Sequence, residues 1–233
     1  MGVKKELELP KYPEPITRLQ NSKNFAPLPI CPTVRDAIAD LPEVEKYLEL
    51  LERDSTVAEY GKPSSYAAML RGFLSQEDDY SYSRLSFPWI LTSSLRIKNS
   101  LETQERFQAT EPGRIEPISH FHKLDAKGIC PTLRAGTDRS RGSHTTARPI
   151  HPFTPRVITV REAARLHSYS DWFRFHKTKL NGFKQVGNSV LPSKVSRLQK
   201  KLFFLFLKCV PALSYSLKKE QAGTEKTTQF QAV

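Results

Sequence analysis

The stretch RVITVREAARL, residues 156–166, carries the clearest structural signal in the chain. Thr159 followed three residues later by Glu162 predicts a capping box, in which the threonine hydroxyl accepts a hydrogen bond from a helix amide and the glutamate reaches back to the Thr159 amide. We therefore expect a helix from about Val160 to His167. Arg161 and Arg165 are four residues apart, so they should share one face of that helix.

The charge of the chain is unevenly distributed. Its 233 residues hold 36 Lys and Arg against 24 Asp and Glu, a formal net charge of +12. Residues 36–59 carry eight acids and two basic residues, whereas residues 134–165 carry seven arginines and two acids, and residues 174–208 carry nine basic residues and no acid. Such a segregated excess favours a polyanionic partner, because Lys and Arg bound to phosphates release counterions. A solvated basic surface is the alternative.

Cysteine content and hydropathy exclude several classes of protein. Cys31, Cys130 and Cys209 have no Cys-x-x-Cys spacing, so the sequence predicts neither a disulfide framework nor a metal site. Residues 1–30 contain no apolar run typical of a signal peptide. The run LFFLFL at 202–207 is far shorter than the roughly 20 apolar residues of a membrane span. We therefore expect a cytoplasmic protein that does not cross a membrane.

Prolines and helical periods divide the chain. Residues 1–33 are rich in proline and are expected to be an extended strap. Thr33 can cap a short helix that Pro42 ends, and further short helices are expected over residues 44–52 and 66–74. Residues 75–150 show little helical period and many Ser, Thr, Gly and Pro, which predicts an irregular module containing strands.

The C-terminal part of the chain has an amphipathic pattern. A last helix is expected from about Ser193, because apolar residues recur three and four apart as one stripe; they are Val195, Leu198, Leu202 and Leu205. This stripe requires a partner surface. Residues 211–233 are polar and are expected to be a disordered tail.

A second informative stretch, GFKQVGNSV at residues 182–190, follows the first. Taken alone, Gly-Asn-Ser predicts an ordinary turn. In this order and at this separation, however, the two stretches resemble the last two sequence motifs of the cytosine-C5 DNA methyltransferases. The resemblance extends to PTVRDAI at 32–38, CPTLRAGTD at 130–138 and RPIHP at 148–152.

The resemblance implies a fold class and a division into domains. The fold is the α/β fold of the S-adenosylmethionine-dependent methyltransferases, of which this chain would hold only two parts. One is the small, mixed α+β target-recognition domain at residues 34–150. The other comprises the bracing helix, the cofactor-closing turn and the C-terminal helix at residues 151–210. Residues 1–33 would be a strap from a missing Rossmann-like catalytic core.

The sequence lacks the family's Pro-Cys nucleophile, its Glu-Asn-Val segment and its cofactor glycine loop. Cys31 and Cys130 each precede a proline instead of following one. Attack on cytosine C6 requires a thiolate and an acid, so we expect no catalytic residue in this chain and no activity of the chain alone.

The resemblance also assigns roles to individual residues. Asn188, Ser189 and Val190 would close over S-adenosylmethionine. The helix that braces the recognition domain would use Thr159, Arg161, Glu162 and Arg165.

The DNA-contacting residues are predicted from the resemblance and from chemistry together. A methyltransferase must flip its target base, so a separate surface has to hold the duplex, and arginine can fork onto guanine O6 and N7. The candidates are Thr132, Leu133, Arg134, Arg139, Arg141 and Arg148. Four aromatic residues either interleave with Arg84 as a reading surface or form the core of a small β module; they are Tyr80, Tyr82, Phe87 and Trp89.

Together these observations predict the C-terminal portion of a DNA (cytosine-5-)-methyltransferase. It would recognise double-stranded DNA and complete the S-adenosylmethionine pocket with a separate N-terminal methyltransferase chain, as in a restriction-modification system. A non-catalytic DNA-binding module or a degenerate fragment is the alternative. An RNA-binding or ribosome-associated protein would explain the charge but not the two motifs.

Overall fold

The computed structural model describes residues 14–22, 27–74, 87–134 and 148–195. The chain divides into two units. One, residues 1–15 with 193–233, consists almost entirely of residues outside the described ranges, among them the predicted apolar stripe beyond Val195 and the predicted tail. The other unit, residues 16–192, contains all the elements below.

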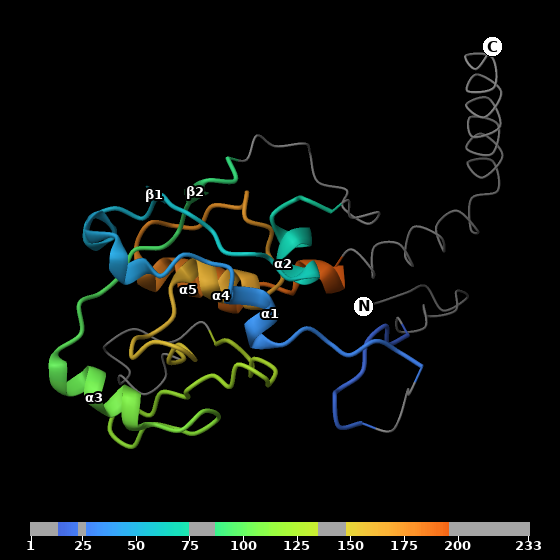
Figure 1. Ribbon diagram of the computed structural model, residues 1–233, viewed down its shortest axis with the longest axis horizontal. Coiled ribbons are helices and arrows are strands. Elements are labelled where there is room, and N and C mark those ends of the chain that lie inside the picture. The colour runs from blue at the N-terminus through green and yellow to red at the C-terminus, as the bar shows by residue number, and fades with distance from the viewer. Residues whose placement is uncertain (1–13, 23–26, 75–86, 135–147, 196–233) are drawn as a thin grey trace, which may run out of the picture. The chain divides into compact units, whose positions relative to one another are not determined.

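Three helices from distant parts of the chain lie side by side in this unit (Figure 1). They are α1 (Val34–Ile38), α4 (Val160–Leu166) and α5 (Lys179–Asn188). Helix α4 contacts both α1 and α5. The helix predicted over residues 160–167 is confirmed to within one residue, and the helix predicted after Thr33 is present as α1.

Capping boxes begin α1 and α4. At α4, Thr159 Oγ1 accepts a hydrogen bond from the Glu162 amide at 3.2 Å, and the Glu162 carboxylate accepts one from the Thr159 amide at 2.6 Å. Thr33 and Asp36 make the same pair of bonds at α1, at 3.2 and 2.8 Å. Each box satisfies amides that have no partner inside the helix, so these short helices begin at defined residues.

The largest hydrophobic core lies between these three helices. It joins residues of α1, α4 and α5 to apolar residues of the connecting segments. Its buried members are Val34, Ala37, Ile38, Leu124, Leu133, Ile158, Val160, Ala163, Ala164, Phe175, Phe183 and Val186. At roughly 1.5–3 kcal/mol for each large apolar side chain, this burial is the main force that holds the helices together.

Helices α4 and α5 approach closely at Gly182. A Cβ atom on this residue would lie 2.8 and 2.9 Å from the two methyl groups of Val160. These distances are too short for a real contact, so only glycine permits this packing.

Shorter elements surround the central helices. Residues 44–52, predicted as one helix, form two 3₁₀ helices instead, η1 (Val44–Lys46) and η2 (Leu48–Leu51), because Tyr47 between them has an extended backbone. Helix α2 (Ser65–Leu70) occupies the first part of the predicted 66–74 helix and ends before Gly72, whose φ is +79°. In the described residues the named strands are β1 (Thr56–Val57) and β2 (Ile90–Leu91), which pair antiparallel with Thr56 opposite Leu91.

Helix α3 (Leu101–Ala109) lies in the region that was predicted to be irregular. Ser100 caps its first turn, and Phe107 anchors it in a small core with Ile150 and Val157. At its other end, the buried Lys123 ammonium donates to the Phe107 and Gln108 carbonyls at 2.9 and 3.3 Å. Lysine suits this position, because a cation stabilises the negative end of a helix.

No helix in the described part of the chain is long and apolar enough to cross a membrane.

Candidate functional site

Helix α4 carries charged side chains into the interior. Arg161, Glu162 and Arg165 are exposed by no more than 2%, and Thr159 by 1%. Charged residues are almost never buried unless they are paired. Their partners therefore show what this helix holds in place.

Arg165 connects α4 to two other segments. Its Nη1 donates to Asp40 Oδ1 at 2.8 Å and to the Ala37 carbonyl at 3.1 Å. Its Nε and Nη2 donate to the two carboxylate oxygens of Asp171, both at 2.6 Å. Because this fork is planar and bidentate, it fixes the end of α1 and the chain after α4 in one orientation.

Arg156 and Glu162 form a second buried pair. Arg156 Nη2 and Nη1 donate to the two Glu162 oxygens at 2.8 and 3.0 Å, and Arg156 Nε donates to Glu43 at 2.9 Å. Burial by itself would raise the pKa of Glu162, but the adjacent Arg156 outweighs it and lowers the pKa to about 2. The pair thus stays ionised and ties η1 to α4.

His151 lies beside this pair and is neutral. Burial lowers the pKa of His151 to about 4, although Glu162 opposes the shift. Its Nδ1 accepts hydrogen bonds from the Phe153 and Thr154 amides at 3.3 and 3.2 Å, a role open only to an unprotonated nitrogen.

Arg161 holds a loop between β2 and α3. Its Nη2 donates to Thr92 Oγ1 at 2.6 Å and to the Phe173 carbonyl at 2.7 Å. Its backbone amide donates to the carbonyl of Ser93, a residue with a φ of 55°. The three arginines of residues 156–165 therefore join four segments to one helix.

The predicted DNA-contacting residues separate into different environments. Thr132 and Arg134 are exposed, and Arg148 is half-buried. Leu133 does not fit the prediction, because its side chain is 6% exposed and belongs to the main core. Arg139 and Arg141 lie outside the described residues.

The predicted cofactor turn is a helix end. Asn188 is the last residue of α5 and is exposed, and Ser189 caps the helix by donating to the Val186 carbonyl at 2.7 Å. Val190 is 57% exposed. An exposed carboxamide at a helix C-terminus suits an ammonium group, because the negative end of the helix dipole lies there. The groups exposed at this helix end, the Asn188 carboxamide and the Val190 side chain, are compatible with one side of an amino-acid ligand, whereas the Ser189 hydroxyl is already engaged.

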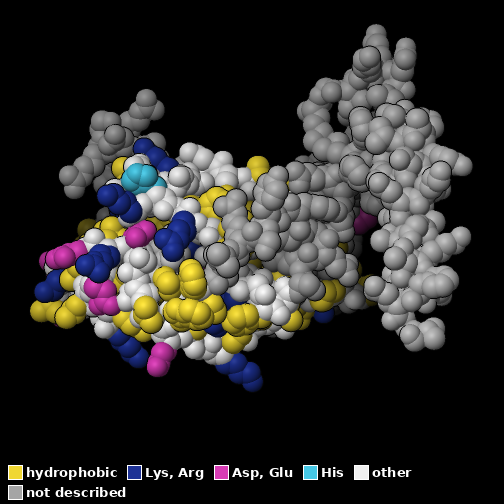
Figure 2. All heavy atoms as spheres, turned by 90° about the horizontal axis from the view of Figure 1, so that it is seen from above, with side chains coloured by type: hydrophobic (Ala, Val, Ile, Leu, Met, Phe, Trp, Pro, Cys, Tyr) yellow, Lys and Arg dark blue, Asp and Glu magenta, His cyan; other side chains and the backbone are white. Residues whose placement is uncertain are grey.

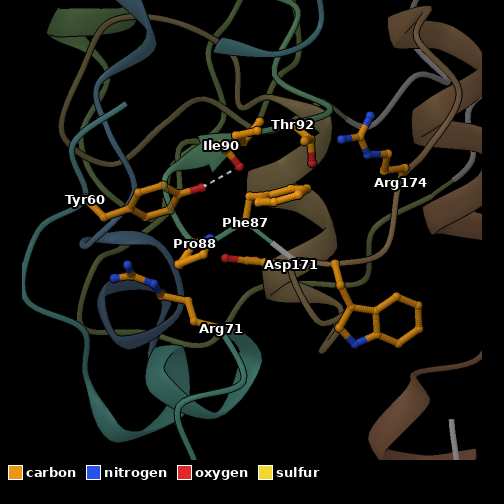
Figure 3. Close-up of a pocket in the computed structure, with 9 residues that line it drawn as sticks. Tyr60, Arg71, Phe87, Pro88, Ile90, Thr92, Asp171 and Arg174 are labelled. Atoms are coloured by element: carbon orange, nitrogen blue, oxygen red, sulfur yellow. Dashed lines mark hydrogen bonds between the residues drawn. The ribbon is translucent and has the colours of Figure 1, made fainter. Parts of the chain in front are cut away.

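A hollow opens beside the Arg165 fork. Tyr60, Phe87, Asp171 and Arg174 surround it (Figure 3). Burial raises the pKa of Tyr60 to about 12, and its hydroxyl donates to the Ile90 carbonyl at 3.4 Å. The guanidinium of Arg71, on the same wall, lies 4.4 Å from the centre of the Tyr60 ring.

Phe87 and Trp89 are 50% and 54% exposed, with their ring centres 5.6 Å apart. For these two residues the alternative in which they form the core of a small β module is therefore wrong, whereas Tyr80, Tyr82 and Arg84 lie outside the described residues. Figure 2 shows hydrophobic side chains gathered on the face in view, with both basic and acidic side chains around them.

The two cysteines with described positions are free and partly buried. Burial raises the pKa of the Cys130 thiol to about 12. At neutral pH this side chain is a thiol, and a thiol is a poor nucleophile.

Comparison with protein families matches residues 1–203 to the C-5 cytosine-specific DNA methylases. The chain belongs to this family, whose members transfer a methyl group from S-adenosylmethionine to DNA. Similarity to individual proteins agrees with this assignment. The type II methyltransferase M.XorII of Xanthomonas oryzae is 53% identical over 192 residues, which cover 82% of this chain and 42% of M.XorII. The type II methyltransferase M.AgeI of Thalassovita gelatinovora is 44% identical over 210 residues, which cover 69% of this chain and 48% of M.AgeI.

A solved structure is also similar. It is that of a putative DNA modification methyltransferase encoded within an E. coli prophage, and it matches with a TM-score of 0.56 at 30% identity. The match covers 77% of this chain and 49% of that one. It supports the methyltransferase fold class predicted from the sequence. The chain spans less than half the length of each of these three relatives.

Sequence reasoning identified the arginines of α4 but missed their partners. Asp40, Glu43 and Asp171 supply the carboxylates. Arg156 belongs by sequence to the basic stretch of residues 134–165, but it is 4% exposed and paired. No sequence signal marks Lys179, a buried lysine at the start of α5.

Proposed function

We propose that this chain is the DNA-recognising and closing portion of a cytosine-C5 DNA methyltransferase of the type II restriction-modification class. Its catalytic segments come from a separate N-terminal methyltransferase chain. These 233 residues contain no Pro-Cys dipeptide and no Glu-Asn-Val segment, so they do not by themselves supply the nucleophile and the acid. The high pKa of Cys130 also argues against a nucleophile at that position.

The observation that carries the proposal is the buried network on α4. Arg156, Arg161 and Arg165 point inward to fix α4 to its neighbours, whereas Thr132 and Arg134 lie on the surface. A flipped base leaves a gap in the duplex, and a surface that holds the DNA in register must itself be rigid. The network supplies that rigidity, and the exposed residues supply contacts to phosphates and base edges.

The C-terminal end of α5 closes one side of the cofactor pocket. S-adenosylmethionine would supply the methyl group there. The Asn188 carboxamide can donate to or accept from the amino-acid part of the ligand, and Val190 offers an exposed apolar contact. Ser189 is engaged with the Val186 carbonyl and sets the angle at which the chain leaves the helix.

DNA binding by the full chain tests the recognition half of this proposal. A duplex of mixed sequence is titrated at several salt concentrations, with the wild type and with the combined Arg134→Ala, Arg139→Ala and Arg141→Ala variant. The affinity of the wild type should fall linearly on logarithmic axes as salt rises, and the variant should show a shallower slope by about two to three. Absence of duplex binding at low salt, or an unchanged slope in the variant, would contradict the proposal.

A further inference from the structure

Two lysines of this chain are equally buried but have different surroundings. Lys123 and Lys179 are each 7% exposed. The Lys123 ammonium donates to two carbonyls at the end of α3. Lys179, by contrast, has neither a hydrogen bond from its ammonium nor an ion pair within 4 Å among the residues that the structure describes. Lysine side chains are almost never buried to this extent unless they are paired, so the position of Lys179 requires an explanation.

The charged groups around Lys179 are mainly positive. Arg148 and Arg156, on the segment that leads into α4, face it together with Glu162 of α4. Burial, Arg148 and Arg156 lower the pKa of Lys179 to about 7, and Glu162 opposes them. The Glu162 carboxylate is already bound by both ends of the Arg156 guanidinium and by the Thr159 amide. Glu43 pairs with Arg156, and His151 is neutral, so neither balances Lys179.

Arg148 is a second cation with unused hydrogen-bonding capacity. Its Nε is buried and has no hydrogen-bond partner, and its guanidinium lies 5.9 Å from the centre of the Phe183 ring on α5. Burial lowers the pKa of Arg148 as well. The residue is half-buried, so one side of it reaches the surface. Lys179 and Arg148 thus place two incompletely compensated positive charges near one end of α5.

We propose that Lys179 and Arg148 form a clamp for one phosphate of the DNA backbone. This clamp deepens the proposed function and rests on it. A phosphate carries the missing negative charge and accepts hydrogen bonds from several donors at once, and arginine and lysine suit it in different ways, as a planar fork and as a point charge. Lys179 and Phe183 lie four residues apart on α5, and the Arg148 guanidinium lies by the Phe183 ring, so the phosphate would be held along this face of the helix.

The clamp should depend on pH. Lys179 is charged below about pH 7 and loses its proton as the pH rises through that value. A bound phosphate favours the charged form, so the contact is strongest in the acidic range. In the protein without DNA, the free energy of unfolding depends on pH in the opposite direction. Below about pH 7 the charged lysine has its full destabilising effect, and the free energy of unfolding increases between that pH and the ordinary lysine pKa of about 10.4.

Duplex binding by Lys179→Met and Lys179→Arg variants of the full chain tests the clamp. The salt slope of Lys179→Met should be shallower than that of the wild type by about one. Between pH 6.5 and 8.5 the wild type should lose more affinity than Lys179→Met does. Lys179→Arg should bind with wild-type affinity at pH 6.5. At pH 8.5 it should lose less affinity than the wild type does, because arginine stays charged.

Two controls separate the clamp from general effects. Lys98→Met removes one positive charge from an exposed position and should leave the pH profile unchanged. Thermal melting at pH 6.5 should show Lys179→Met at or above the melting temperature of the wild type, since an uncompensated buried charge has been removed. A large decrease in that melting temperature would assign Lys179 a structural role and overturn the clamp.

The remaining outcomes distinguish this inference from the proposed function. If the wild type binds DNA and Lys179→Met shows the same salt slope and pH profile, the clamp is wrong and the recognition function stands. If the wild type does not bind DNA, both are wrong. If inorganic phosphate raises the melting temperature of the wild type but not of Lys179→Met, while their DNA slopes agree, the site takes a free anion and the assignment to DNA is overturned.

Discussion

Two groups of arginines, both within residues 134–165, serve different purposes. Arg156, Arg161 and Arg165 are at most 4% exposed and engage carboxylates or carbonyls of distant segments. Arg134 and Arg148, in contrast, are exposed and half-buried, respectively. A cluster that reads in sequence as one basic surface is therefore divided between internal bracing and external binding. The difference shows that a count of charges cannot predict a nucleic-acid surface until the internal partners are known.

The largest expected effect comes from breaking the internal group. Arg165→Met should decrease the free energy of unfolding by about 3–5 kcal/mol, because it removes the closest cation from the buried Asp40 and the half-buried Asp171 and leaves them only the longer contacts to Arg71 and Arg161. Chemical denaturation of the full chain measures this. Arg134→Met is the matched control at an exposed position and should change stability by no more than about 0.5 kcal/mol. Equal effects of the two substitutions would remove the distinction between the groups.

A pH titration of stability sharpens the same comparison. The folded-state pKa of Glu162, about 2, lies below its ordinary value of 4.5. Its contribution is therefore fully present above about pH 4.5 and is lost as the pH falls toward 2. A lowering of that size corresponds to on the order of 3 kcal/mol. Glu162→Gln should be less stable than the wild type at pH 7, and the difference should narrow in acid. If the difference in free energy of unfolding between the two proteins stayed constant from pH 7 to pH 3, the ion pair with Arg156 would not be its cause.

The smallest effect on stability, and a clear effect on binding, is expected at Arg134. Arg134→Ala should melt within a few degrees of the wild type and should lower the salt slope of duplex binding by about one. Fluorescence anisotropy with a labelled duplex measures the slope. An Arg134→Ala variant that unfolds easily but binds DNA with an unchanged slope would place Arg134 with the bracing residues.

Local signals in the sequence predicted the parts of the fold that depend on neighbouring residues. The N-cap Thr33 and the capping box at Thr159 located α1 and α4, because such capping hydrogen bonds span only three residues. Helix α5 was not predicted. It contains Asn181, Gly182 and Gly187, which are poor helix formers, and it is held by packing against α4, where Gly182 meets Val160.

The site was only partly predicted, because it too depends on contacts between distant segments. The resemblance to a methyltransferase family selected Arg161 and Arg165, but the carboxylates they need lie elsewhere in the sequence. Glu43 is 113 residues from Arg156, and Asp40 is 125 residues from Arg165. No spacing rule connects residues so far apart. The core position of Leu133 and the unpaired charge of Lys179 likewise depend on tertiary contacts that a linear pattern does not contain.

Methyl transfer tests the central claim of a divided methyltransferase most directly. The purified chain is incubated with duplex DNA and labelled S-adenosylmethionine, alone and together with the portion of M.XorII that this chain does not match. We predict no labelled DNA with the chain alone, and labelled cytosine when the second portion is added. Methylation by the chain alone that is lost in Cys31→Ser or Cys130→Ser, or a failure of the combined portions to methylate DNA, would contradict the account.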